Sequence, residues 1–368
     1  MNDTTTKKIR ILLVEDSAVV ALLLKAIFEQ EPDFEVVGRA ENGREGVQLA
    51  RALKPDLITM DIRMPQMDGF EATREIMATE PVPIVVISSS VDDEELRITF
   101  RAIEEGALAV IEKPRGIGHP DFEAIRRELV TTVRAMAEVK LVRRRRTQPS
   151  AEEVSASVSD VPARQAAWSP RRCRVIAVGA STGGPQALRA LFSGLPGTLP
   201  VPLAVVQHIG HGFIHGLVEW LDALGGPRCR VATQGERLLP GHAYFAPDDH
   251  HLRLERSGSD LRAVLSNDPP EDGIRPAVNL LLDSVATQCG AEALGVVLSG
   301  MGCDGARGLL AMHEAGAATL VQDEASSVVF GMPGAALARG AAAEALAPET
   351  IADRIRQLVG TLPDRVTA

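Results

Sequence analysis

The sequence predicts two α/β domains joined by a linker, and three observations support this expectation. The chain has 368 residues, which is long for one domain and suits two. Short apolar runs alternate with amphipathic stretches in two separate parts of the chain. Between these parts, residues 139–172 are rich in Ser, Ala, Glu and Pro without apolar periodicity, as is typical of flexible linkers. We therefore expect domains at residues 1–138 and 173–368.

Runs of apolar and β-branched residues predict the strands of the first domain. They cover residues 9–14, 34–38, 56–60, 83–87 and 109–111. Amphipathic patterns between them predict helices at residues 17–30, 43–53, 69–79 and 93–105. Regular alternation of strands and helices is typical of a doubly wound sheet, so we expect five parallel strands here.

The second domain shows the same alternation and predicts a Rossmann-like α/β fold. Its expected strands cover residues 174–178, 201–206, 243–246, 251–254, 261–265, 294–298 and 317–321. Its expected helices cover residues 184–193, 212–224, 276–288 and 305–315.

Composition excludes several classes of protein. The net charge of -10 and an aromatic content of 3% argue against a nucleic-acid binder, so we interpret Arg143–Arg146 as a solvated helix end. No apolar run is long enough to span a membrane, and the N-terminus lacks a secretory apolar region. The four cysteines form no CxxC pair, so we expect reduced thiols, a cytoplasmic location and a packing role for Cys303.

Charged and hydroxyl side chains follow the predicted strands of the first domain. Glu15 and Asp16 follow the first strand, Asp61 the third, Ser88 the fourth and Lys113 the fifth. The carboxyl ends of parallel strands meet at one edge, so three carboxylates would converge there and repel each other without a cation. An all-oxygen ligand set suits Mg²⁺, and Ser88 and Lys113 could hold a phosphoryl group on one carboxylate.

Two motifs in this domain resemble those of two-component receiver domains. They are Asp61-Ile62-Arg63-Met64-Pro65-Gln66-Met67-Asp68-Gly69 and Glu112-Lys113-Pro114. The resemblance implies that Asp61 is the phosphoacceptor, that Glu15, Asp16 and Asp61 bind Mg²⁺, and that Ser88 and Lys113 contact the phosphoryl group. It also implies a histidine kinase as phosphodonor.

In the second domain, an apolar strand ends in the Gly-x-Ser-x-Gly turn Gly179-Ala180-Ser181-Thr182-Gly183. This pattern exposes a serine hydroxyl at the tip of a strand, with glycines leaving room for a substrate. A phosphate-binding loop has a similar appearance. The turn alone leaves both interpretations open.

A nucleophilic serine needs a base and an acid that orients the base. His208 directly follows the strand 201–206, and Asp304 lies on a glycine-rich loop after the strand 294–298. Two alternatives stay open at this point. The spacing of His208, His211 and His215 could indicate zinc, although glycines interrupt the segment. Asp304 could also cap the helix that begins near Gly305.

Several motifs of the second domain together resemble the catalytic domain of chemotaxis protein-glutamate methylesterases. These motifs are Gly179–Gly184, Gln207-His208, Ala246-Pro247, Gly300–Gly305, Gln322-Asp323-Glu324 and Val329–Pro333. The resemblance implies hydrolysis of glutamyl methyl esters on chemoreceptors, with release of methanol, and deamidation of receptor glutamines. It carries Ser181 as nucleophile, His208 as base, Asp304 as orienting acid and backbone near Met301 as oxyanion donor.

The chain differs from this family at Ile209-Gly210 and at Gly273–Asn279, near the presumed substrate surface. We expect a monomer without nucleic acid, without membrane insertion and without a cofactor in the second domain. We also expect the unphosphorylated receiver to cover the Ser181 edge. A DNA-binding response regulator and a catalytically inactive phosphate sink are the alternative functions.

Overall fold

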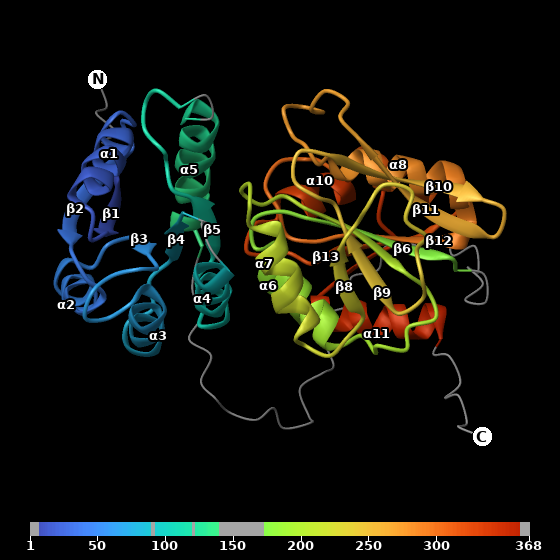
Figure 1. The fold of residues 1–368 in the computed structure, drawn as a ribbon, viewed down its shortest axis with the longest axis horizontal. Helices are drawn as coiled ribbons and strands as arrows, with labels where there is room; N and C mark the ends of the chain where they lie inside the picture. The colour runs from blue at the N-terminus through green and yellow to red at the C-terminus, as the bar shows by residue number, and fades with distance from the viewer. Residues whose placement is uncertain (1–6, 90–92, 120–121, 140–172, 361–368) are drawn as a thin grey trace.

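The computed structural model describes residues 7–89, 93–119, 122–139 and 173–360. It contains two parallel sheets, each covered by helices, in an N-terminal and a C-terminal domain that lie side by side (Figure 1). The expected fold class, two α/β domains, is confirmed. The predicted linker and Arg143–Arg146 lie outside the described residues, apart from residue 139.

The N-terminal sheet has five parallel strands in the order β2-β1-β3-β4-β5. The strands are β1 (Ile9–Val14), β2 (Phe34–Ala40), β3 (Leu57–Asp61), β4 (Ile84–Ser88) and β5 (Ala109–Glu112). The helices are α1 (Ala18–Glu29), α2 (Gly43–Leu53), α3 (Gly69–Thr79), α4 (Asp93–Glu104) and α5 (Phe122–Ala137). The order changes direction between β1 and β3, which opens a crevice at their carboxyl ends.

Three short polar side chains start helices of this domain. Ser17, Asn42 and Asp68 each accept a hydrogen bond from the backbone N–H three residues later. These bonds satisfy N–H groups that the first turn of a helix leaves without a partner. The caps hold the loops after β1 and β3 close to the crevice.

The C-terminal sheet has seven parallel strands in the order β14-β13-β12-β6-β7-β9-β8. Its strands are β6 (Val175–Ala180), β7 (Leu203–Gln207), β8 (Arg228–Val231), β9 (His242–Phe245), β12 (Ala293–Val297), β13 (Ala318–Gln322) and β14 (Glu344–Leu346). The helices are α6 (Gly184–Ser193), α7 (Ile214–Asp222), α8 (Val278–Cys289), α9 (Ala306–Glu314), α10 (Gly331–Ala338) and α11 (Pro348–Val359). A short 3₁₀ helix covers Gly290–Glu292.

The strands β10 (His251–Ser257) and β11 (Asp260–Ser266) form a separate antiparallel hairpin rather than joining the main sheet. Sequence analysis did not predict β8, β14, α10 or α11. The edge strands β8 and β14 are only four and three residues long and show little burial, so they lack a distinct apolar run. The central strand β6 is buried along its whole length, as a parallel strand covered on both faces must be.

Helix α4 of the N-terminal domain packs on helices α6 and α7 of the C-terminal domain (Figure 1). The rings of Phe100 and Trp220 stack with their centroids 5.5 Å apart. Trp220 Nε1 donates to a Glu104 carboxylate oxygen at 2.9 Å. Nearby, Gln186 Nε2 donates to the carbonyl oxygen of Ala107. These contacts join the two domains together with apolar packing, in which Val328 and Val329 lie against the core of the N-terminal domain. In the described part of the chain, no helix has the length and apolar character needed to cross a membrane.

Candidate functional sites

Ser181, His208 and Asp304 lie just beyond the carboxyl ends of three adjacent strands, β6, β7 and β12. After β6 the chain adds β7 on one side, and β12 later joins on the other. The strand order therefore reverses next to β6, and a ligand crevice is expected at such a point. Ser181 and His208 line one cavity there, and Asp304 contacts His208.

The turn that carries Ser181 is held by backbone contacts on both sides. Ser181 N–H donates to the carbonyl oxygen of Ser299 at 3.0 Å, and Gln207 Nε2 donates to the Ser181 carbonyl oxygen at 2.8 Å. Gly183 has φ +77°, and a Cβ there would lie 2.5 Å from Val328 Cβ. A side chain at this position would be both strained and obstructed, which explains the glycine.

His208 Nε2 lies 3.0 Å from Asp304 Oδ2, within ion-pair distance. The approach does not meet the angular requirement of a hydrogen bond, so the imidazole would have to rotate slightly to donate along this line. Burial raises the pKa of the Asp304 carboxyl, but His208 and backbone N–H donors outweigh it and hold this pKa below its usual value. Asp304 is thus an ionised group that can orient His208.

The same carboxylate caps helix α8. Val278 N–H donates to Asp304 Oδ2 at 2.7 Å, and Asn279 N–H donates to Oδ1 at 2.8 Å. Gly305 N–H, at the start of α9, also donates to Oδ1 at 2.8 Å. The expected cap of α9 is wrong, because the N-cap of α9 is Gly305, which has no side chain that could cap this helix. The carboxylate instead binds the N-terminus of α8 and contacts His208 at the same time.

The loop after β12 brings backbone donors to the same cavity. Gly300 N–H donates to the Val329 carbonyl oxygen, and the Gly300 carbonyl oxygen accepts from Met332 N–H at 2.8 Å. Within the described chain, the N–H groups of Met301 and Gly302 have no protein acceptor. Both residues line the cavity together with Ser181. These N–H groups are therefore free to bind a ligand oxygen.

The cavity lies between the two domains and has a volume of about 700 Å³. The C-terminal domain contributes the edge around Ser181 and His208 and the loop from Asp272 to Pro276. The N-terminal domain contributes Ala124, Arg127, Glu128, Thr131 and Thr132, which follow helical spacing along one face of α5. Desolvation and the charge of Glu112 raise the pKa of the Glu128 carboxyl to about 7, while His208 acts in the opposite direction.

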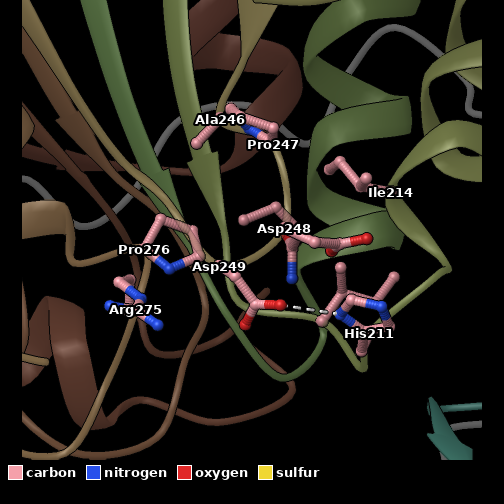
Figure 2. Close-up of a pocket in the computed structure, with 10 residues that line it drawn as sticks. His211, Ile214, Ala246, Pro247, Asp248, Asp249, Arg275 and Pro276 are labelled. Carbon is pink, nitrogen blue, oxygen red and sulfur yellow. Dashed lines mark ion pairs between the residues drawn. The ribbon is translucent and has the colours of Figure 1, made fainter. Parts of the chain in front are cut away.

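The zinc alternative is wrong. His211 lies before α7 and His215 within it, so no single helix presents the three histidines. Figure 2 shows that His211 pairs instead with Asp249, with Nδ1 and Oδ2 3.2 Å apart, beside a small cavity of about 60 Å³. Cys303 is exposed and does not pack, because the loop after β12 carries it away from the core.

The second site lies in the crevice of the N-terminal domain. Carboxylate oxygens of Glu15, Asp16 and Asp61 lie within 4.8 Å of one another. Lys113 Nζ lies 2.7 Å from Asp61 Oδ2 and 3.1 Å from Glu15 Oε2. Ser88 is fully buried at the end of the neighbouring strand, and its Oγ accepts from Thr99 Oγ1 at 3.4 Å. The structure thus brings Glu15, Asp61 and Lys113 into direct contact, with Asp16 close to the two carboxylates and Ser88 at the end of the adjacent strand β4.

Electrostatics in this crevice favour a bound cation. Burial and the charge of Asp61 raise the pKa of Glu15 to about 7, although Lys113 lowers it. Burial also raises the pKa of Asp61. Burial lowers the pKa of Lys113, but the nearby carboxylates of Asp61 and Glu15 raise it by more, so the pKa of Lys113 lies above its usual value. The oxygen ligands fit a small hard cation, whose charge would offset the repulsion between Glu15 and Asp61.

Comparison with known families agrees with both sites. A family model described as "CheB methylesterase" matches residues 176–355, and one described as "Response regulator receiver domain" matches residues 11–119. The protein-glutamate methylesterase/protein-glutamine glutaminase 4 of Geobacter metallireducens is 46% identical over 95% of this chain and 99% of its own. The chain belongs to the CheB methylesterase family. A Myxococcus xanthus relative with the same name is 47% identical over 94% of this chain and 96% of its own.

A solved structure supports the fold of the C-terminal domain in this family. The catalytic domain of Thermotoga maritima CheB methylesterase is 33% identical, has a TM-score of 0.50 and covers 51% of this chain and 99% of its own. The expected family and enzyme class are confirmed. The alternative of a DNA-binding output domain is wrong, since the C-terminal domain is a seven-stranded parallel sheet that matches the CheB model.

Sequence analysis assigned no role to two buried polar residues, Asn279 and Gln322, that support the CheB catalytic edge. Asn279 Oδ1 accepts from Gly305 N–H at 3.0 Å and from Gly308 N–H at 2.9 Å. Gln322 Oε1 accepts from Ser299 N–H at 2.7 Å, and Ser299 Oγ donates to the Thr182 carbonyl oxygen at 2.8 Å. The signal for Gln322 was its place at the end of an apolar strand. Asn279 gave no such signal, because its partners lie on a different helix.

Proposed function

We propose that this protein hydrolyses glutamyl methyl esters and deamidates glutamines of chemoreceptors when its receiver domain is phosphorylated. The relatives are named protein-glutamate methylesterases and protein-glutamine glutaminases, which sets the substrate class. The proposal divides the chain into a receiver at residues 1–138, a linker at 139–172 and a catalytic domain at 173–368. We propose that it works in the cytoplasm as a monomer.

The observation that carries the proposal is the position of His208 between Asp304 and the cavity that Ser181 lines. His208 Nε2 faces Asp304 Oδ2, which leaves Nδ1 as the ring nitrogen available to Ser181. An imidazole oriented through one nitrogen can remove a proton through the other. We assign Ser181 as nucleophile, His208 as base and Asp304 as the acid that orients His208.

The reaction follows from these assignments. Ser181 Oγ attacks the ester carbonyl carbon while its proton passes to His208, and the N–H groups near Met301 bind the oxyanion. The C–O bond to the methoxy group then breaks, and the His208 proton leaves with methanol. A water molecule, deprotonated by His208, hydrolyses the resulting acyl-enzyme and yields glutamate and free Ser181. A glutamine substrate releases ammonia in place of methanol.

The receiver crevice supplies the switch. We assign Asp61 as the acceptor of a phosphoryl group from a histidine kinase. Glu15, Asp16 and Asp61 would hold Mg²⁺, which provides positive charge for phosphoryl transfer when bound. Lys113, already 2.7 Å from Asp61, and Ser88 at the end of β4 would contact the phosphoryl oxygens. A phosphoryl group would replace the present ion pair between Lys113 and Asp61.

Regulation follows from the position of the receiver. Helix α5 faces the Ser181 cavity, and α4 holds the domains together through Phe100 and Trp220. A receptor helix is about 10 Å wide, and α5 occupies one side of the cavity that such a helix would have to enter. We propose that phosphorylation of Asp61 weakens the α4 contact and opens the catalytic edge.

Methanol release from methylated chemoreceptor tests the catalytic assignment. We expect Ser181→Ala to abolish release and Cys303→Ser to retain it. Cys303 is the matched control because its exposed thiol is a second nucleophile on the loop beside the cavity. Full activity in Ser181→Ala would refute the assignment.

Phosphorylation with acetyl phosphate and Mg²⁺ tests the switch. We expect the wild-type rate to increase and the Asp61→Asn rate to stay at its unphosphorylated level. The isolated 173–368 fragment should be faster than the unphosphorylated full chain. Equal rates for fragment and full chain would contradict inhibition by the receiver.

A further inference from the structure

Arg275 lies on the loop from Asp272 to Pro276 that forms one wall of the Ser181 cavity. Arg275 lies three positions before Val278 in the chain, and Val278 N–H donates to Asp304 Oδ2. Three residues span at most about 11 Å between Cα atoms, so the Arg275 backbone lies close to the catalytic edge. An arginine side chain attached there is long enough to meet the part of a substrate that flanks the reacting group.

The guanidinium of Arg275 is held in place but keeps unused donors. Nη1 donates to the carbonyl oxygens of Asn267 and Asp268 at 3.4 and 3.2 Å. Nε is shielded from solvent and has no hydrogen-bond partner among the described residues. Arg275 also forms no ion pair with a described carboxylate, whereas Arg253 nearby pairs with Asp268 at 2.8 Å. Nη2 has no hydrogen-bond partner among the described residues and, unlike Nε, is not shielded from solvent, so it is the donor that a ligand can reach.

Two carboxylates that line a small cavity with Arg275 have other partners. Asp248 and Asp249 line the small cavity with Arg275, as Figure 2 shows. Asp248 Oδ2 accepts from Gly212 N–H at 2.9 Å, and Asp249 pairs with His211. Neither forms an ion pair with Arg275. Among the described residues, no carboxylate therefore forms an ion pair with the guanidinium of Arg275.

The loop that carries Arg275 is rigidly attached. Glu271 and Ile274 exchange two backbone hydrogen bonds, and Glu271 Oε1 accepts from Arg307 at 2.8 Å and from Asn279 Nδ2 at 3.0 Å. Ala277 N–H donates to Nδ1 of the buried His251 at 3.1 Å. These bonds fix the loop from both ends, so the arginine is preorganised for a ligand.

We propose that Arg275 is a specificity-determining residue that binds a carboxylate flanking the target glutamyl ester or glutamine in the substrate protein. The free Nη2 group can donate to a carboxylate oxygen, and the positive charge of the guanidinium strengthens this hydrogen bond. The substrate sequence that fits best carries an aspartate or glutamate close to the modified residue. This inference rests on the proposed function, since it concerns the same reaction at Ser181.

Two helical peptides test the proposal with the phosphorylated full chain. Both carry one glutamyl methyl ester, and they differ only in a glutamate or a glutamine one helical turn away. We expect the wild type to have a kcat/KM about tenfold higher for the acidic peptide, because one charge-assisted hydrogen bond can strengthen binding by this amount. The difference should lie in a lower KM, with kcat unchanged. In Arg275→Gln this ratio should fall to about one, and Arg275→Lys should restore part of it.

The ratio separates substrate binding from a structural role, because a loosened loop would slow both peptides and leave their ratio unchanged. Arg262→Gln is the matched control, since Arg262 Nη1 also donates to a backbone carbonyl oxygen, that of Gly235, and does not line the cavity, and its ratio should equal that of the wild type. A wild type without preference, or a preference retained in Arg275→Gln, would overturn the proposal. Loss of turnover of both peptides by the wild type would instead refute the proposed function.

Discussion

His208 Nε2 and Asp304 Oδ2 lie 3.0 Å apart, and the same Asp304 carboxylate accepts the first N–H groups of helix α8. One side chain therefore joins the proposed catalytic base to the start of a helix. Burial of this carboxylate is compensated by two kinds of partner, the imidazole and the backbone donors. Changes at Asp304 should affect both rate and stability.

Asp304→Asn should lower kcat strongly. The amide cannot stabilise a charged His208 as a carboxylate does, and loss of a triad acid costs roughly 10³- to 10⁴-fold. Both carboxylate oxygens accept backbone N–H groups, so the NH₂ group of the introduced amide would face either Val278 N–H or the N–H groups of Asn279 and Gly305. Two donors would then point at each other, which should lower the free energy of unfolding by about 1–3 kcal/mol. Methanol release and urea unfolding measure the two effects. A variant with near-normal kcat would contradict the role assigned to Asp304.

The pH dependence of stability should carry the signature of Asp304. Its pKa is lower in the folded protein than in the unfolded chain. The stability that it contributes is therefore fully present above the unfolded value of 3.8 and is lost as the pH falls through the folded pKa. The difference in melting temperature between wild type and Asp304→Asn should be constant from about pH 5 to 7 in calorimetry, and it should shrink below about pH 4. A difference that grows in acid would be inconsistent with a lowered pKa.

Asn279→Ala should destabilise the catalytic domain by about 2–4 kcal/mol, because it leaves two buried N–H groups of Gly305 and Gly308 without an acceptor. Chemical unfolding of the full chain measures this loss. Asn267→Ala is the control, since that side chain is exposed and should change stability by less than about 0.5 kcal/mol. Equal effects of the two substitutions would show that the Asn279 bonds are not needed.

Trp220→Ala should raise the rate of the unphosphorylated chain on receptor. The substitution removes the stack with Phe100 and the hydrogen bond to Glu104, which together contribute about 1–2 kcal/mol to the contact between the domains. The fraction of molecules in which this contact is open should therefore rise by about tenfold. Methanol release without acetyl phosphate measures it.

Arg189→Ala is the matched control for the same helix contact. Its 3.8 Å ion pair with Glu104 is partly exposed, and such pairs contribute little. The rate should stay within about fivefold of the wild type, because an exposed pair is worth about 0–1 kcal/mol. If Trp220→Ala also left the basal rate unchanged, the α4 contact would not restrain the enzyme.

Much of the fold followed from local patterns. The five strands of the receiver and the buried strand before Ser181 are short apolar runs, and their side-chain pattern requires a sheet covered on both faces. The positions of Glu15, Asp61, His208 and Asp304 at strand ends also followed, because parallel strands deliver their carboxyl ends to one edge. The resemblance to receivers and to methylesterases depended on these same residues.

Other features were decided only by tertiary structure. The zinc hypothesis for His208, His211 and His215 assumed a helix that the glycines prevent, and Cys303 is exposed although packing was expected. Neither the anchoring of Asp304 by helix α8 nor the stack of Phe100 on Trp220 has a local pattern, because each joins segments far apart in the chain. Strand-end chemistry is local and could be predicted from the sequence. The partners that hold each charge in place depend on how distant elements pack, and only the folded chain brings them together.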